Sequence, residues 1–353
     1  MKLQNIMNQS LLTEMLEEGY VRERHHPYLD LRILNYSEKA QFGKVWNEVT
    51  LQCRGLIVNS TDEIIARPFD KFMNYGENQD DKLLMNYEVV ITDKMDGSLG
   101  ILWNYAGEQG IATRGSFISD PACHATQLWR AKYSDLNISE GYTYLFEIVY
   151  PENRIVLDYG DMDDLVLLGV RDIEEGYVLL PNEVSDWTGP KSHTFPYATL
   201  REALEAPQRP NAEGFVAYFP DLDYRIKIKQ EDYLALHKIV FDLTEKRIYQ
   251  ALHTGSTLAT LYNTIPDEFH PWLFDVWNKY QDAFLNTLAD INADWLKVTK
   301  ELDAEYPEGW GKRELASVAR NYPTQHYLYR KHAGDITGIH NMVRKSIGFY
   351  KSQ

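Results

Sequence analysis

Seven apolar side chains between residues 280 and 302 follow one another at intervals of four, four, three, four, three and four positions. They are Tyr280, Phe284, Leu288, Ile291, Trp295, Val298 and Leu302. This spacing predicts one α-helix of more than 20 residues with a single apolar face. Pro307 and Gly309 predict its end, and shorter helices are predicted at 312–320 and 338–350.

The chain between about residue 30 and residue 235 has a different pattern. Turn residues separate short apolar runs, which predict strands. The predicted strands are 51–59, 64–68, 88–92, 99–105, 142–149, 165–171, 214–219 and 224–229. Helical spacing interrupts them at 122–133 and 199–205. We therefore predict an α+β fold, in which a domain of antiparallel sheets with flanking helices (1–240) precedes an all-helical domain (241–353).

Composition narrows the classes of protein that remain. The 353 residues are 44% hydrophobic and 25% charged, as in ordinary globular proteins of two domains. Cys53 and Cys123 make neither a disulfide framework nor a zinc quartet, which predicts a cytoplasmic protein. No apolar run is long enough to span a membrane, so no membrane partner is expected.

Charge is unevenly distributed. The net charge of −16 argues against a general nucleic-acid coat protein, but residues 311–353 alone carry +6 and the rest −22. Cations alternate with aromatic residues at 320–332, as expected of a surface that holds RNA phosphates and stacks bases. The alternative is a helical face that pairs with the acidic stretch 267–308.

One short motif suggests chemistry. The apolar run 89–92 leads into Lys94-Met95-Asp96-Gly97. A lysine amine at a strand end can attack the α-phosphate of a nucleoside triphosphate and hold the nucleotide as a phosphoramidate. Gly97 is expected to turn the chain at positive φ. A plain turn between two strands would give the same residues.

Further segments follow in a fixed order. They are Cys53-Arg54-Gly55, Lys71-Phe72-Met73-Asn74, Thr113-Arg114-Gly115, Leu145-Phe146-Glu147, Asn153-Arg154-Ile155-Val156-Leu157, Glu213-Gly214-Phe215-Val216 and Arg225-Ile226-Lys227-Ile228-Lys229. This order resembles the covalent nucleotidyltransferases, a superfamily of ATP-dependent ligases and mRNA capping enzymes. Within it, residues 30–237 resemble the T-even bacteriophage RNA ligase 1 family.

The resemblance implies an ATP-dependent RNA ligase that works with Mg²⁺, for which Mn²⁺ can substitute. Lys94 would become lysyl-AMP, pass AMP to the 5′-phosphate of one RNA end, and a 3′-hydroxyl end would then displace AMP. A cleaved tRNA is one RNA partner that the resemblance implies, and the location would be the host cytoplasm if a phage encodes the chain.

The resemblance also implies residue roles. The residues expected to contact the nucleotide are Tyr36, Arg54, Lys71, Arg114, Glu147, Lys227 and Lys229. Glu147 is expected on the ribose, and Lys227 and Lys229 are expected to be catalytic, because two lysines on one strand face can balance charge on the α-phosphate. Glu213 and Asp96 are the candidate metal residues, acting through water. Arg114 stands where the family has lysine.

Other interpretations remain open from the sequence. Tyr36 fits a core or rim aromatic, Asp96 fits a cap on the turn before Gly97, and Lys227 with Lys229 fits a solvated strand face. The stretch 253–258 lacks the acidic pair that the resembled phage ligase has after its catalytic domain. The rival functions are a DNA ligase, a capping guanylyltransferase, or a non-catalytic protein that binds RNA ends.

Overall fold

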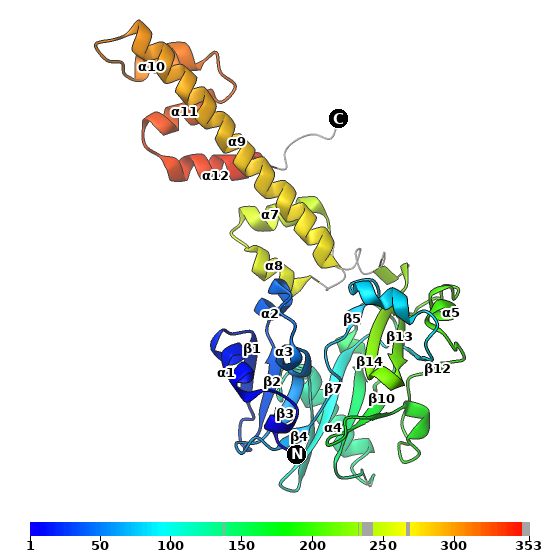
Figure 1. Cartoon of the computed structure of the whole chain (residues 1–353). Helices are drawn as coiled ribbons and strands as arrows, with labels where there is room; N and C mark the ends of the chain where they lie inside the picture. Colours follow the sequence, from blue (N-terminus) through cyan, green and yellow to red (C-terminus); the bar gives the residue numbers. More distant parts are fainter. Residues whose placement is uncertain (137, 232, 235–242, 266–268, 348–353) are drawn as a thin grey trace. The chain divides into compact units, whose positions relative to one another are not determined.

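The structure is a computed structural model that describes residues 1–136, 138–231, 233–234, 243–265 and 269–347. The chain divides into two compact units, Met1–Val240 and Phe241–Gln353 (Figure 1). The predicted α+β class is confirmed: the described part of the first unit contains three sheets with flanking helices, and that of the second contains helices.

The first sheet follows the chain order. Its strands are β1 (Val21–His25), β2 (Arg32–Tyr36), β3 (Arg54–Val58) and β4 (Ile64–Ala66), all antiparallel. The short helices of this region are η1 (Leu3–Asn5), α1 (Gln9–Glu17), α2 (Glu38–Gly43) and α3 (Glu48–Gln52). One apolar cluster joins α1 and α3 to the sheet through Leu12, Met15, Val49 and Leu56.

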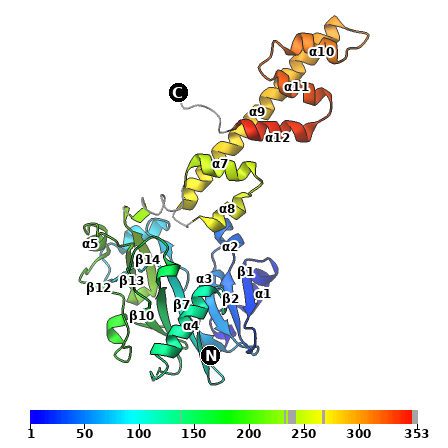
Figure 2. The same cartoon turned by 180° about the vertical axis from the view of Figure 1, so that it is seen from behind.

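The second sheet is antiparallel, in the order β11-β10-β9-β7-β8. Its strands are β7 (Ser98–Tyr105), β8 (Glu108–Ala112), β9 (Tyr142–Val149), β10 (Asp164–Asp172) and β11 (Val178–Leu179). Helix α4 (Asp120–Lys132) covers one face with Leu128 and Trp129 (Figure 2). The other face packs on the first sheet, where Ile101 and Leu145 meet Ile57.

The third sheet has the order β12-β6-β13-β14-β5. Its strands are β5 (Met73–Asn74), β6 (Val90–Asp93), β12 (Thr194–Phe195), β13 (Gly214–Phe219) and β14 (Tyr224–Lys229). Only the β14–β5 pair is parallel among those described. Ile91, Ala217 and Ile226 are buried on one face with α5 (Leu200–Leu204). Because side chains alternate along a strand, Lys227 and Lys229 point to the opposite face.

The remaining short helices of the first unit are η2 (Gln79–Leu84), η3 (Pro151–Asn153), η4 (Pro181–Glu183) and η5 (Pro220–Leu222). The second unit consists of α7 (Glu245–His253), α8 (Leu258–Thr264), α9 (His270–Glu305), α10 (Lys312–Ala319), α11 (Gln325–His332) and α12 (Ile336–Ser346) in its described part. None of the helices described combines the length and apolar character that crossing a membrane requires.

Helix α9 contains the apolar face predicted for 280–302, and Ile291, Val298 and Leu302 on it are buried. It begins earlier than predicted, with Pro271 in its first turn, and it ends at Glu305 before Pro307. Helix α12 begins at Ile336, where the Asp335 side chain caps it. The predicted positions 348–350 lie outside the described residues.

One strand prediction was wrong at its start. The run 51–59 was predicted as a single strand, but α3 occupies 48–52 and β3 begins at Arg54. The cause is a local cap: Asn47 Oδ1 accepts hydrogen bonds from the N–H groups of Val49 and Thr50, at 3.0 and 2.9 Å. The strand therefore starts only after the capped turn.

Candidate functional site

Lys94 follows β6 directly. Together with Gly214 and Lys229 on the neighbouring strands it forms a row of adjacent residues across the third sheet. The Lys94 N–H donates to Gly214 O at 3.1 Å, and Gly214 is the register partner of Lys229 on β14. Gly214 has φ +145, and a Cβ there would lie 1.9 Å from Ile228 O. The row therefore requires glycine at its centre, and no side chain separates the two lysines.

Glu213 joins these two lysines. Its Oε1 lies 2.7 Å from Lys94 Nζ and 3.3 Å from Lys229 Nζ. The Glu213 side chain is only 3% exposed, against 19% for Lys94 and 10% for Lys229. A carboxylate buried this deeply is stabilised by its cations, and removal of a partner leaves an uncompensated charge.

Arg209 and Gln230 hold the strand ends that carry this cluster. Arg209 Nη2 donates to Asp93 Oδ1 and to Gly214 O, both at 2.8 Å. Gln230 N donates to Glu213 O at 2.9 Å, and Gln230 Oε1 accepts from Arg209 N at 2.6 Å. Neither residue was predicted from the sequence, since nothing in the local spacing connects position 209 with position 93.

Glu147 approaches the cluster from β9 of the second sheet. Burial raises the pKa of its carboxyl to about 8, and the negative charges of Glu213 and Asp96 add to this effect. The positive charges of Lys94 and Arg54 act in the opposite direction. Glu147 therefore lies within electrostatic reach of four other predicted site residues.

Asp96 is engaged by the protein itself. Its Oδ2 accepts from the N–H groups of Val156 and Leu157 at 2.9 and 2.8 Å, and its Oδ1 accepts from Tyr233 Oη at 3.0 Å. These bonds fix the loop after Lys94. They give Asp96 a positioning role, while its predicted metal role stays a prediction.

Gly97 was expected to adopt a positive φ, and this expectation was wrong. Gly97 is not among the residues with positive φ. A Cβ at this position would instead lie 2.6 Å from Ile148 O and 3.1 Å from Glu147 Cγ. Glycine is required because β9 passes close to the loop, and this close approach brings Glu147 beside the Lys94 segment.

Tyr36, Lys71 and Arg114 form a second group at the end of β2. Arg114 Nη1 donates to Tyr36 Oη at 2.7 Å. The Arg114 guanidinium and Lys71 Nζ lie 5.0 and 5.7 Å from the centre of the Tyr36 ring. Lys71 Nζ also lies 5.6 Å from the Trp46 ring. Two cations thus face aromatic rings, an arrangement that keeps positive charge partly buried.

The cations of Arg54 and Lys227 both lie near the aromatic ring of Phe72. The Arg54 guanidinium lies 5.3 Å from the centre of the Phe72 ring, and Lys227 Nζ lies 5.6 Å from it. Burial lowers the pKa of Arg54, while Tyr36 and Glu147 oppose this shift. Phe72 lies in a motif of the sequence but was given no role there. The structure thus brings all ten predicted residues into one connected set.

The set has the composition of a site for a polyanion. Six cations converge on it, and they suit phosphate oxygens, which accept charge-assisted hydrogen bonds. They are Arg54, Lys71, Lys94, Arg114, Lys227 and Lys229. No group of three or more potential metal ligands occurs among the described residues. Mg²⁺ does not need one, because it is commonly held by one or two carboxylates, water and substrate phosphates. Glu213, one of the two predicted metal residues, fits that pattern.

Comparison with known proteins identifies the family of the chain. The family model described as RNA ligase matches residues 52–233. A candidate bifunctional polynucleotide kinase/RNA ligase of Autographa californica nuclear polyhedrosis virus is 31% identical over 62% of this chain, which spans 35% of that protein. An RNA ligase of Rhodothermus phage RM378 is 22% identical over 87% of this chain and 86% of its own length.

A solved archaeal ATP-dependent RNA ligase aligns with a TM-score of 0.45 and 15% identity, over 70% of this chain and 65% of that one. The family match alone spans more than half of the 353 residues and contains most of the predicted site. The predicted resemblance is confirmed, and the chain belongs to the RNA ligase family.

Proposed function

We propose that this chain is an ATP-dependent RNA ligase that joins 5′-phosphate and 3′-hydroxyl RNA ends, with Lys94 as the nucleophile. The observation that carries the proposal is the row of Lys94, Gly214 and Lys229 held by the carboxylate of Glu213. It places an amine at a strand end, beside a proton acceptor and a second cation. These are the groups that attack on a phosphate requires.

In the first step the Lys94 amine forms a bond to the α-phosphorus of ATP. The bond from this phosphorus to the bridging oxygen breaks, and pyrophosphate leaves with its electron pair. The amine must lose a proton, and Glu213 Oε1, at 2.7 Å, is placed to accept it. Lys227 and Lys229 then stabilise the negative charge that develops on the phosphate oxygens.

The other predicted residues would bind the nucleotide. A Glu147 carboxyl with a pKa of about 8 is largely protonated at neutral pH, so it can both donate to and accept from ribose hydroxyls. Arg54 offers a planar set of donors beside it. Tyr36, Lys71 and Arg114 form a cationic aromatic surface for the phosphates or the base.

A divalent cation, Mg²⁺ or Mn²⁺, would be held near Glu213 through water and would neutralise charge on the phosphates. The donor set fits such a weakly held metal. Asp96 has three protein donors on its carboxylate, so its main role in this proposal is to fix the Lys94 loop.

Two further steps complete the reaction. An oxygen of the RNA 5′-phosphate attacks the phosphorus of lysyl-AMP, and the N–P bond breaks to free Lys94. The 3′-hydroxyl oxygen of the other end then attacks the 5′-phosphate, and AMP leaves. We propose that the reaction takes place in the cytoplasm, in the host if a phage encodes the chain.

We propose that the helical unit recognises RNA, with tRNA repair as one role. Arg320 and Tyr329 are exposed there. Other groups pair within the unit. Tyr322 Oη donates at 2.5 Å to Oε1 of Glu301, which lies in the acidic stretch 267–308, and Arg330 pairs with Asp335, which lies outside that stretch. The RNA surface would therefore be smaller than the sequence pattern indicated.

The nearest rivals are a DNA ligase and a capping guanylyltransferase, which usually carry a C-terminal β-barrel. The described residues between 243 and 347 form helices and no strand. This disfavours both rivals on the same scaffold.

The proposal is tested with α-labelled ATP and a divalent cation. Label should remain on the protein in a denaturing gel, disappear in Lys94→Ala, and leave when 5′-phosphorylated RNA is added. Label from GTP instead would indicate capping chemistry. RNA binding without any label would indicate a protein that only binds RNA ends.

A further inference from the structure

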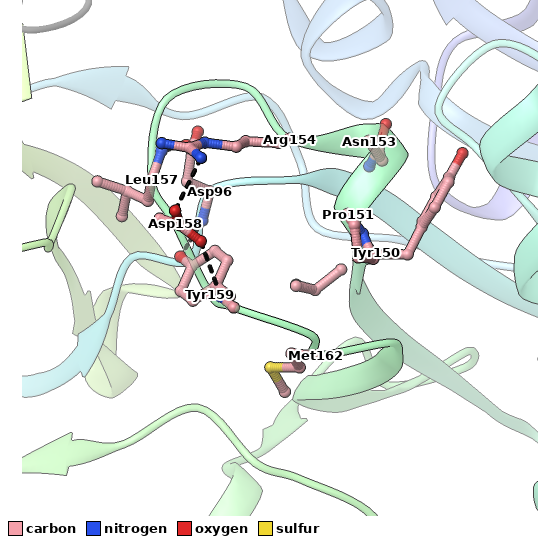
Figure 3. A pocket seen from close by; sticks show the side chains of 11 residues that line it. Asp96, Tyr150, Pro151, Asn153, Arg154, Leu157, Asp158, Tyr159 and Met162 are labelled. Atoms are coloured by element: carbon pink, nitrogen blue, oxygen red, sulfur yellow. Dashed lines mark hydrogen bonds and ion pairs between the residues drawn. The ribbon is translucent and has the colours of Figure 1, made fainter.

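A separate pocket of about 110 Å³ opens beside Asp96 (Figure 3). The loop that follows β9, residues 149–162, provides the rest of its wall. This loop contains the segment Asn153-Arg154-Ile155-Val156-Leu157, to which the proposed chemistry gives no role. Asp96 is the only predicted site residue in its lining, so the pocket is distinct from the cationic set around Lys94.

The lining is mainly apolar. Tyr150 and Tyr159 lie on opposite sides of the pocket (Figure 3). Val149, Leu157 and Met162 are its aliphatic lining residues. Pockets for drug-sized ligands have volumes of about 300–1,000 Å³, so this smaller pocket holds only a part of such a ligand, such as one ring system. Tyrosine rings with aliphatic neighbours suit the faces of a nucleobase.

A cation lies at the rim. The Arg154 side chain is 52% exposed, and its Nη1 donates to Asp158 Oδ2 at 2.8 Å. Its Nε donates to Val156 O at 3.4 Å. A guanidinium has five N–H donors, and the remaining three find no acceptor among the residues that the structure describes. They are available to phosphate oxygens beside a bound base.

Hydrogen bonds connect the pocket to the loop that follows Lys94. Tyr159 Oη accepts a hydrogen bond from Asp96 N at 2.9 Å, and Asp96 Oδ2 holds the N–H groups of Val156 and Leu157. Asp96 stands two positions after Lys94. A ligand in the pocket would therefore contact the same loop that presents the amine.

We propose that this pocket binds the base of the 5′-terminal nucleotide of the RNA donor strand, with Arg154 on the adjoining phosphodiester. The inference rests on the proposed function. That reaction needs the donor 5′-phosphate to reach AMP on Lys94, whereas ATP has its own cations at Arg54, Lys71 and Lys227. A base pocket one loop away from Lys94 is where a donor end would be held.

The ligase steps allow a clean test. Arg154→Met removes the charge, and Met162→Trp fills the pocket. The control is Arg130→Met, because Arg130 is also exposed, at 61%, and lies on α4. Both pocket variants should adenylate from ATP within about twofold of wild type. In single-turnover transfer from the pre-adenylated protein, the concentration of 5′-phosphorylated RNA for half-maximal rate should rise about tenfold or more, equivalent to about 1.4 kcal/mol.

Each other outcome is informative. Unchanged transfer overturns the proposal. Equal loss of adenylation and transfer shows a purely structural role for the loop. A higher requirement for the 3′-hydroxyl strand alone, measured with pre-adenylated RNA, assigns the pocket to the acceptor and overturns the donor assignment. Failure of the proposed function would be seen separately, since wild-type protein would then take no label from ATP.

Discussion

Glu213 holds Lys94 through an ion pair of 2.7 Å between Oε1 and Nζ, and this carboxylate is almost fully buried. The pair fixes the direction of the amine before any substrate binds. In the proposed reaction the amine must lose a proton, and Glu213 Oε1 lies within hydrogen-bond distance of it. The same carboxylate is shared with Lys229, which couples the proposed nucleophile to a second cation.

Replacement of Glu213 by Gln should slow adenylation about 10- to 100-fold, because hydrogen bonds to charged groups contribute about 1.5–3 kcal/mol. The amide has the same size but cannot pair with two ammonium groups or accept the proton. Single-turnover labelling at saturating ATP measures the effect. Glu205→Gln, at an exposed position, is the matched control. A Glu213→Gln protein with the wild-type rate would remove Glu213 from the chemistry.

Arg209→Met should reduce the adenylation rate about 10- to 100-fold, since small displacements of reacting groups have effects of this size. The substitution removes the bonds to Asp93 and Gly214 that align the ends of β6 and β13. Arg209 acts through other residues, so kcat should fall more than KM for ATP rises. Arg201→Met serves as the control, because Arg201 is an exposed residue of α5. Equal changes in both Arg variants would contradict the positioning role.

Glu147 makes stability depend on pH. Its folded pKa of about 8 lies above the unfolded value of 4.5, so the folded state binds the extra proton between these pH values. Its contribution is fully present below about pH 4.5 and is lost as pH rises toward 8. Glu147→Gln should therefore be more stable than wild type above pH 8, as measured by urea unfolding at several pH values.

The control for this experiment is Glu152→Gln, which neutralises an exposed carboxylate nearby. It should leave the pH profile of unfolding unchanged. Glu147→Gln should also bind ATP more weakly if Glu147 contacts the ribose. Parallel pH profiles for wild type and Glu147→Gln would contradict the burial effect.

Arg320→Gln should weaken RNA binding and reduce its salt dependence. If Arg320 contacts one phosphate, the slope of log affinity against log salt should fall by about 0.7 for single-stranded RNA. Lys300→Gln removes one cation of α9 that is also exposed, and it should have no such effect. Equal slopes for both variants and wild type would place the RNA surface elsewhere.

Much of the candidate site could be predicted because its residues lie on or beside strands that the local pattern of apolar residues predicts. The bounds of β9, β13 and β14 match the predicted 142–149, 214–219 and 224–229. Alternation along β14 alone placed Lys227 and Lys229 on one face. The order of the motifs predicted the other site residues, and each of these residues lies at or near a strand end.

What the sequence did not predict depends on contacts between distant segments. Arg209 lies in a loop after α5, and its bond to Asp93 exists only once the strands have paired. Gly97 is required by the approach of β9 and not by its own φ. The start of β3 was misplaced because the capped turn at Asn47 overrides the apolar run that follows.

The central claim is that Lys94 carries the nucleotide. The most direct test is to incubate the full chain with ATP and Mg²⁺, digest it, and map the modified residue by mass spectrometry. The account predicts one AMP on the peptide that contains Lys94, and none in Lys94→Ala. AMP on Lys71, Lys227 or Lys229 in the wild-type protein, or AMP retained by Lys94→Ala, would contradict it.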